Sequence, residues 1–496
     1  MNANKGYYLC VDFGSQSIRA KLINQKGESI CHTSLDNFKY LHPKTLLNEQ
    51  LVEQDSDWFY QVFLTACQRL MKQAESLGIE ACDIYCLSIT TMRNTVFSLD
   101  ENGKQTGNAI LWWDKRLATK LPKLAWYWRL ILNVASFFAI AKISNVKDSI
   151  IQLQKEAFVN HIHQYEPQRL KNTKHWLLLS GYLNFRLTGR FVDAKASVIS
   201  HLPINFKNGK MRSRFSWYSQ AFAIKKTWLP RLVNTGSEIG RINETNAKCF
   251  FGENTPVIAA AADKACEVLG AGCIEQGDVH ISLGSAISIC AVNKKFKGHK
   301  AFYPAYPSAI NELYLTEIMI ANGMISLTKY IKAHNDKFKA LVPQEPLPNN
   351  IRLESLIEKH IVDNEIVARE TVFDLKNAEK YNDVFAGFSH KDVAPFQGYV
   401  AIIDAIVDAI FNSYQQISKR VAMNTGYIVV TGGGANSDLL LQKLSNKLQV
   451  TIEKPKNIDA GTLGVAMICA VSLKHYNNYD DAKLNMVKYH KRIIPQ

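Results

Sequence analysis

Residues 7–30, YYLCVDFGSQSIRAKLINQKGESI, decide the fold of this chain. An apolar, β-prone run is followed by a polar turn containing Gly14 and then by a second β-prone run. Residues 277–292, GDVHISLGSAISICAV, repeat this order around Gly284. The echo indicates an internal repeat, so we expect two domains that each open with a strand, a small-residue turn and a strand.

The length supports the same division. A chain of 496 residues exceeds the size at which a single hydrophobic core keeps growing, and its apolar and charged fractions are those of a globular protein. We expect the domains to cover 1–254 and 255–496. In the first, Asp55 is expected to cap a helix with apolar positions at Phe59, Phe63, Ala66 and Leu70.

The composition sets the class of partner. Lys and Arg number 59 and Asp and Glu 44, an excess that suits nucleic acid, an anionic membrane or a polyanionic small molecule. The basic residues are spread along the chain without a block of five or more, which favours a solvated surface and predicts no nucleic-acid partner. The ten cysteines show no zinc spacing and the N-terminus no secretory signal, so we expect a reducing, cytoplasmic compartment.

Residues 124–144, LAWYWRLILNVASFFAIAKIS, are mostly apolar and aromatic. The charge-free run within them, 130–141, is shorter than the roughly 18 residues that a transmembrane helix needs, so no transmembrane segment is expected. The stretch favours a buried or partner-facing helix over peripheral contact with a membrane.

Three Gly- or Asp-containing turns are candidates for chemistry. At Asp12-Phe13-Gly14, glycine lets the backbone approach a ligand, although a plain hairpin accounts for the same residues. Residues 432–434, Gly-Gly-Gly, lie between an apolar strand and a helix and suit close approach of a flat or anionic ligand. Asp263 ends a small-residue strand, where it is placed either as a base or as the N-cap of the next helix.

The arrangement of these elements resembles the FGGY carbohydrate kinase family of the actin-like ATPase superfamily over nearly the whole chain. Further segments carry the resemblance: VEQD at 52–55, TMRNT at 91–95, AILWWDKR at 109–116, and RLTG at 186–189 with Asp193 after it. The implied fold is α/β, with two actin-like (ribonuclease H-like) domains and a central cleft. The implied activity is ATP-dependent phosphorylation of a hydroxyl on a small sugar, ketose or polyol.

The resemblance also implies roles for single residues. Asp263 would be the general base, and Asp12 would act near Mg²⁺. The residues around ATP would be Asp12, Gly14, Ser15, Gln16, Ser17, Arg19, Gly284 and Ser285 at the phosphates, with Gly433, Gly434 and Asp438 at the adenosine. The substrate would meet Met92, Arg93, Trp112, Asp263 and Lys264. Arg offers fixed donors to hydroxyl oxygens, and a Trp face suits a polyol's carbon chain.

The chain departs from the family pattern in two places. The usual loop ahead of the last helices is replaced by FDLKNAEKYNDVFAGFS at 373–389, and Ser285 stands where many relatives have Thr. Both departures bear on substrate identity more than on ATP binding.

The expected mechanism has Asp263 accept the hydroxyl proton during attack on the γ-phosphoryl group, while domain closure excludes water. Two alternatives stay open: an actin-like ATPase without a sugar substrate, and a catalytically silent relative that regulates or scaffolds. A homodimer, with 124–144 in its interface, also stays open.

Overall fold

A computed structural model describes most of the chain. It leaves out residues 1–5, 44–49, 138–140, 244–246, 248–250, 253, 301–302, 341–352, 370, 381–382, 390–392, 425 and 457–458, and of 135–137 and 141–146 it describes the backbone alone. The chain forms two compact units. The first contains 1–270, 306–312 and 461–486, and the second contains 271–305, 313–460 and 487–496.

The first unit is built on the predicted strand, turn and strand. β1 (Tyr7–Phe13) pairs antiparallel with β2 (Ser17–Ile23) and parallel with β5 (Ile84–Thr91). Because side chains alternate between the faces of a strand, Leu9, Val11 and Phe13 join one hydrophobic core while Asp12 belongs to the opposite face. The register sets Asp12 beside both Arg19 and Thr90.

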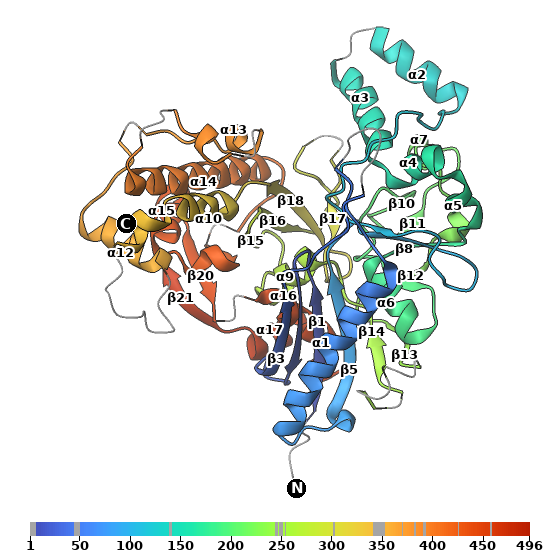
Figure 1. Ribbon diagram of the computed structural model, residues 1–496, viewed down its shortest axis with the longest axis horizontal. Coiled ribbons are helices and arrows are strands. Elements are labelled where there is room, and N and C mark those ends of the chain that lie inside the picture. The colour runs from blue at the N-terminus through green and yellow to red at the C-terminus, as the bar shows by residue number, and fades with distance from the viewer. Residues whose placement is uncertain are drawn as a thin grey trace. The chain divides into compact units, whose positions relative to one another are not determined.

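Helices cover both faces of this sheet (Figure 1). α1 (Ser56–Ser76) begins where Asp55 accepts a hydrogen bond from the amide of Asp57, and its predicted apolar stripe is buried against the strands. On the other face, α16 (Ala460–Ser472) meets α9 (Asp263–Gly270) so closely that a Cβ at Gly464 would lie 1.9 Å from the Cys266 carbonyl oxygen.

The sheet of the first unit runs in the order β13-β14-β5-β1-β2-β3, and a four-stranded sheet runs β4-β7-β6-β8. The remaining strands of the first unit are β3 (Ser29–Asp36), β4 (Glu53–Gln54), β6 (Val96–Leu99), β7 (Ala109–Ile110), β8 (His175–Leu178), β9 (Val192–Ala194), β10 (Ile204–Asn205), β11 (Lys210–Met211), β12 (Arg231–Val233), β13 (Glu238–Arg241) and β14 (Pro256–Ile258). Its remaining helices are α2 (Trp126–Phe137), α3 (Ala141–Glu156), α4 (Phe158–Tyr165), α5 (Pro167–Asn172), α6 (Leu179–Thr188), α7 (Trp217–Gln220) and α17 (Tyr479–Met486).

The second unit repeats the same strand order. β15 (Val279–Leu283) pairs antiparallel with β16 (Ile287–Asn293) and parallel with β19 (Tyr427–Thr431), and β16 pairs with β18 (Tyr314–Ile320). The order β19-β15-β16-β18 therefore matches β5-β1-β2-β3 in direction and sequence of pairing. The predicted internal repeat is confirmed.

In the second unit, α14 packs against α10 and α15, and α14 and α15 pack on the strands (Figure 1). Its other elements are β20 (Thr451–Pro455), β21 (Tyr489–Ile493), α10 (Met324–Ala333), α11 (Asn335–Lys339), α12 (Leu353–Asp363), α13 (Leu375–Lys380), α14 (Pro395–Ser418) and α15 (Asp438–Leu448). The divergent segment 373–389 contributes α13 and a 3₁₀ turn at Phe385–Gly387, and its residues 381–382 lie outside the described part.

Two expectations change. The first unit extends to Gly270, beyond the boundary expected near residue 254, and it includes β14, which pairs with β5 and continues its sheet. Of the two alternatives for 124–144, a buried or a partner-facing helix, the buried one does not hold for the exposed side of α2, where Trp126 is 69% and Leu130 55% exposed, and the partner-facing one stays a prediction; 138–140 lie outside the described residues. No helix in the described parts of the chain combines the length and hydropathy that spanning a bilayer requires.

Asp193 is expected to make the stability of the first unit depend on pH. The carboxylate is buried, accepts hydrogen bonds from Ser180 Oγ at 2.7 Å and from the amide of Ala194 at 2.8 Å, and has its pKa raised by burial from 3.8 to about 7. Because the folded state holds this proton more tightly, its contribution is complete below about pH 4 and is lost as pH rises to about 7.

We therefore expect the free energy of unfolding to fall by up to about 4 kcal/mol between about pH 4 and pH 7 through this carboxyl group. Urea unfolding across this range measures the slope. Asp193→Asn, which cannot ionise, should flatten it. An equal slope in that variant would assign the pH dependence to other groups.

Candidate active site

The first predicted phosphate loop is the turn between β1 and β2. The amide of Gly14 donates to the Ser17 carbonyl at 2.9 Å, and a Cβ at Gly14 would lie 3.3 Å from the same oxygen. The Tyr40 hydroxyl donates to the Ser15 carbonyl at 2.7 Å, and the Phe38 amide donates to Gln16 at 3.4 Å. The turn is thus held from outside by the segment after β3.

Asp12 lies at the end of β1, next to this turn. Its side chain is 16% exposed, and its carboxylate is 3.7 Å from the Arg19 guanidinium, which β2 places opposite. A Cβ at Gly461, in the first turn of α16, would be 3.3 Å from Asp12 Oδ2. The positive end of the α16 dipole therefore faces a carboxylate, which favours the negative charge of Asp12.

Asp263 is the first residue of α9. The carbonyl of Ala262 accepts the first helical hydrogen bonds, from Ala265 and Cys266, so Ala262 occupies the N-cap position. Asp263 Oδ1 accepts from the Lys264 amide at 2.8 Å and lies 3.7 Å from Arg93 Nε. The side chains of Arg93 and Asp263 are 20% and 32% exposed, so this pair meets solvent.

The end of β5 supplies the neighbours of Asp263. Met92 is buried, and its amide donates to the Phe13 carbonyl at 3.0 Å; Arg93 follows it and lies over the Tyr306 ring at 5.3 Å. Lys264 forms an ion pair with Glu267 at 2.7 Å. Burial raises the pKa of the Cys266 thiol to about 12, and the charges of Asp12 and Asp263 add to this rise.

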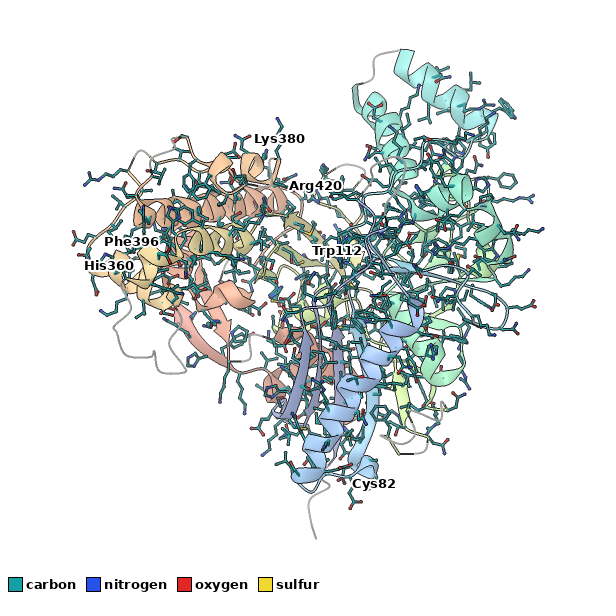
Figure 2. All side chains as sticks on the ribbon, in the orientation of Figure 1. Cys82, Trp112, His360, Lys380, Phe396 and Arg420 are labelled. Atoms are coloured by element: carbon teal, nitrogen blue, oxygen red, sulfur yellow. The ribbon has the colours of Figure 1, made fainter. Side chains whose placement is uncertain are left out.

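Trp112 connects two predicted groups of residues. It comes from the turn after β7 and is labelled in Figure 2. Its side chain is 41% exposed and packs edge to face on Trp113 with 5.5 Å between ring centroids. Its Nε1 donates to Ser15 Oγ at 2.8 Å. The predicted substrate tryptophan is therefore hydrogen-bonded to the predicted phosphate loop, a contact that sequence reasoning missed.

The second unit carries the other predicted nucleotide residues. Gly284 and Ser285 form the turn between β15 and β16, and their carbonyls accept from the first amides of α10 at 3.3 Å. Gly432 has a φ of 86° and lies against the backbone of Leu283, at the start of this turn. A Cβ added at Gly432 would be 2.9 Å from the Leu283 carbonyl oxygen. The two glycine turns of this unit are thus neighbours.

Gly433 and Gly434 differ in the space around them. An added Cβ at Gly433 meets no described atom within 4 Å, whereas at Gly434 it would be 2.8 Å from the Leu283 side chain. Ser437 caps α15 by accepting from the Leu440 amide at 3.0 Å. Asp438 follows, with a side chain 67% exposed and paired to Lys491 at 2.8 Å.

Sequence comparison places these observations in a family. Residues 7–270 match the model of the N-terminal domain of the FGGY family of carbohydrate kinases, and residues 367–473 match the model of the C-terminal domain of the same family. The chain belongs to the FGGY family of carbohydrate kinases. It is a phosphotransferase that acts on an alcohol group, in a family that uses ATP.

Individual relatives agree. An uncharacterized sugar kinase of Escherichia coli is 28% identical over 329 residues, 64% of this chain and 64% of that protein, so the match covers less than two thirds of that relative. The xylulose kinase of Bacillus subtilis is 21% identical over 99% of this chain and 93% of its own. The structure of xylulose kinase from Lactobacillus acidophilus has a TM-score of 0.75 at 18% identity, covering 99% of this chain and 94% of that one. The expected two-domain α/β fold is confirmed.

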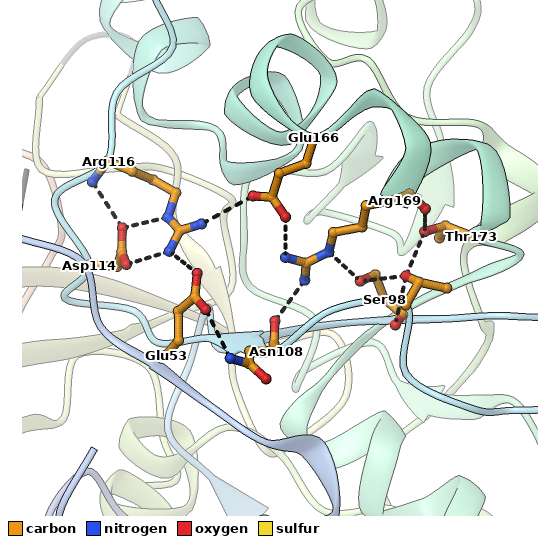
Figure 3. Close-up of polar contacts among 9 residues, drawn as sticks. Glu53, Ser98, Asn108, Asp114, Arg116, Glu166, Arg169 and Thr173 are labelled. Atoms are coloured by element: carbon orange, nitrogen blue, oxygen red, sulfur yellow. Dashed lines mark hydrogen bonds and ion pairs between the residues drawn. The ribbon is translucent and has the colours of Figure 1, made fainter. Parts of the chain in front are cut away.

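The turn that presents Trp112 in this FGGY kinase is anchored by a buried arginine (Figure 3). Arg116 donates from Nε to Asp114 Oδ1 and from Nη2 to Oδ2, both at 2.8 Å, and from Nη2 to Glu53 Oε1 at 2.7 Å. Asp114 Oδ2 also accepts from the Val52 amide at 2.6 Å. Burial lowers the pKa of Arg116, but the hydrogen bonds and charges of Asp114 and Glu53 outweigh it and raise that pKa overall.

A second arginine extends the network (Figure 3). Glu166 lies 3.8 Å from Arg116 and 3.1 Å from Arg169, which donates to Ser98 Oγ at 2.9 Å and to the Asn108 carbonyl at 2.7 Å. The network joins α5 to the sheet containing β4, β6 and β7. Asp114 and Arg116 stand in the quoted segment 109–116, but nothing in the sequence pairs them with Glu53 or Glu166.

Arg116→Lys tests this anchor. Lysine keeps the charge but loses the fork that bonds both Asp114 oxygens and Glu53, so we expect the free energy of unfolding to fall by about 2 kcal/mol. Arg241→Lys, which alters an exposed pair with Glu238, should change it by less than about 0.5 kcal/mol. Urea unfolding of both variants gives the comparison; equal small losses would contradict the anchoring role.

Proposed function

We propose that this FGGY kinase uses ATP and Mg²⁺ to phosphorylate a hydroxyl of a small ketose or polyol, with Asp263 as the general base. The observation that carries the proposal is the pairing of Asp263 with Arg93 at the end of β5, in the unit that also holds the turn at Gly14. A partly exposed carboxylate beside a guanidinium offers a proton acceptor and hydroxyl donors at one place.

The acceptor is proposed to lie over Trp112 and against Arg93. A half-exposed indole provides an apolar face for the carbon chain, while Arg93 and Lys264 provide donors for its hydroxyl oxygens. Met92, which is buried, is proposed to line the base of this site. Relatives named as xylulose kinases and glycerol kinases support a ketopentose or a three-carbon polyol as the first substrates to test.

The phosphates are proposed to bind the backbone of the turn at residues 14–17, with Arg19 close by. In the second unit, the turn of Gly284 and Ser285 is proposed as a phosphate-binding turn of the same kind. Backbone amides in such turns suit anionic oxygens. In the second unit, the open space above Gly433 suits a flat ligand, so Gly433 and Gly434 are proposed to border the adenosine. Asp438 is also proposed to border the adenosine, although its carboxylate pairs with Lys491.

Asp12 fits a role near Mg²⁺. Magnesium in phosphoryl-transfer sites is held by one or two carboxylates together with water and phosphate oxygens. Asp12, partly exposed at a strand end, supplies one such carboxylate. When bound, the ion would neutralise negative charge on the phosphate oxygens.

The chain's own residues then position the reaction. Asp263 accepts the proton as the substrate oxygen attacks the γ-phosphoryl group, Arg93 orients that carboxylate and the acceptor, and the loop amides stabilise the charge on the transferring group. Because Trp112 Nε1 donates to Ser15 Oγ, this hydrogen bond would connect the proposed acceptor site to the first phosphate turn.

Asp263→Asn should lower turnover by roughly 10² to 10⁴, the usual contribution of a positioned base, while ATP still binds. Glu267→Gln is the matched control: it removes a carboxylate one turn along α9 that pairs with Lys264. Steady-state kinetics measures the loss of turnover, and nucleotide titration measures whether ATP still binds. Full turnover in Asp263→Asn would refute its assignment as the base.

The acceptor is identified by measuring ADP release with a series of ketopentoses, ketohexoses, glycerol and other polyols, against water alone. One chemical class should raise ADP release well above the rate with water, because the base needs a bound hydroxyl. Hydrolysis that no acceptor stimulates would contradict the proposed substrate class.

A further inference from the structure

α2 carries an apolar face that points away from the core of its own unit. Trp126, Leu130, Ile131 and Val134 are 69%, 55%, 52% and 46% exposed. At about 100° per residue, these four positions fall within an arc of about 140° on one side of the helix. We call them the α2 face.

The opposite side of α2 makes the contacts that fold it. Leu132 is buried with Leu124 and with Ile150 of α3. Near the start of α2, Trp128 Nε1 donates to the Phe215 carbonyl at 2.7 Å, and the Phe215 side chain is itself 61% exposed. Figure 1 shows α2 and α3 extending beyond α4 and α7 at the edge of the first unit.

The surroundings of the α2 face are basic. No Asp or Glu occurs in residues 115–147, which contain α2, or in residues 194–237, which contain Phe215. Exposed cations flank the face: Lys123 precedes α2, Arg129 lies on it, and the Arg214 guanidinium lies 4.8 Å from the centre of the Phe215 ring. The acidic residue next along the chain is Asp148, on α3.

The charge and the side-chain types of the α2 face together indicate which class of partner binds it. A second copy of this face would bring like charges together, and a nucleic acid would use the cations but leave Leu130, Ile131 and Val134 in water. An anionic bilayer accommodates both the apolar and the basic side chains, because aliphatic and Trp side chains enter the interface while Lys and Arg reach the headgroups.

We propose that the α2 face binds this kinase to the surface of an anionic lipid bilayer, with α2 lying in the interface plane. The helix has 12 residues, which is too short to cross the hydrocarbon core and suits an interfacial position. The binding is separate from the proposed active site, because none of the residues of the α2 face has a role there.

Flotation with vesicles tests the proposal on the full chain. Protein should float with phosphatidylcholine vesicles that contain phosphatidylserine and not with phosphatidylcholine alone. Binding should weaken when salt is raised from about 0.1 M to about 1 M, where the Debye length falls from about 10 Å to about 3 Å. Absence of flotation with the anionic vesicles at low salt would overturn the proposal.

Variants assign the binding to α2. Trp126→Ser with Leu130→Ser should lower the partition coefficient by at least about tenfold, because two large side chains no longer enter the interface. Leu484→Ser, at a position 83% exposed on α17, is the apolar control and should not change it. Lys123→Glu with Arg129→Glu should also weaken binding, whereas Arg69→Glu with Lys72→Glu on α1 should have a much smaller effect. Equal losses in test and control variants would refute the α2 site.

Two further readouts separate the rivals. Fluorescence quenching by brominated lipid should fall when Trp126 is replaced by Phe, if its ring enters the bilayer. Light scattering that shows a dimer dissociating in Trp126→Ser with Leu130→Ser, without loss of vesicle binding, would assign the face to a second copy and overturn the proposal. Kinase activity in solution should be the same in that variant and the unaltered chain, whichever substrate is found.

Discussion

The buried fork between Arg116 and Asp114 is the constraint on which the first unit's site depends. A guanidinium shielded from water is tolerated only when its donors are bonded, and here Asp114 and Glu53 bond it from two segments. Asp114 also closes the turn that starts at Leu111, through its amide at 3.0 Å. Trp112 stands on that turn and donates to Ser15, so a buried charge pair fixes the position of an exposed ring and, through it, of a loop.

The repeated strand order explains why the fold could be predicted from sequence. Each unit needs a β-prone run, a turn without bulky side chains and a second β-prone run, and these local requirements are visible at Gly14 and Gly284. The later segments of the chain that also belong to the first unit could not be predicted from the sequence. The segments 306–312 and 461–486 bring Tyr306 to Arg93 and Gly461 to Asp12, and such contacts depend on tertiary packing that no local pattern encodes.

The candidate site divides in the same way. Asp12 lies near the end of a buried strand, and Arg93 and Asp263 follow buried strands. Their placement near strand ends could be inferred from hydrophobic runs, and Arg93 does meet Asp263. The partners of Arg116 could not be inferred, because Glu53 and Glu166 are distant in sequence and look like ordinary surface acids. Asp438 was named from the resemblance alone; its pairing with Lys491 on an exposed surface is a competing use of the same carboxylate.

The α2 face is informative because folding does not account for it. Trp126, Leu130, Ile131 and Val134 remain largely in water, so they contribute little of the apolar burial that stabilises the folded chain. Helix propensity does not explain them either, since Trp, Ile and Val are poorer helix formers than Ala or Lys. A sequence that places such residues outward, in segments without acidic side chains, carries a constraint other than the fold. Binding to an apolar, anionic surface supplies that constraint, because both features then contribute to the same free energy.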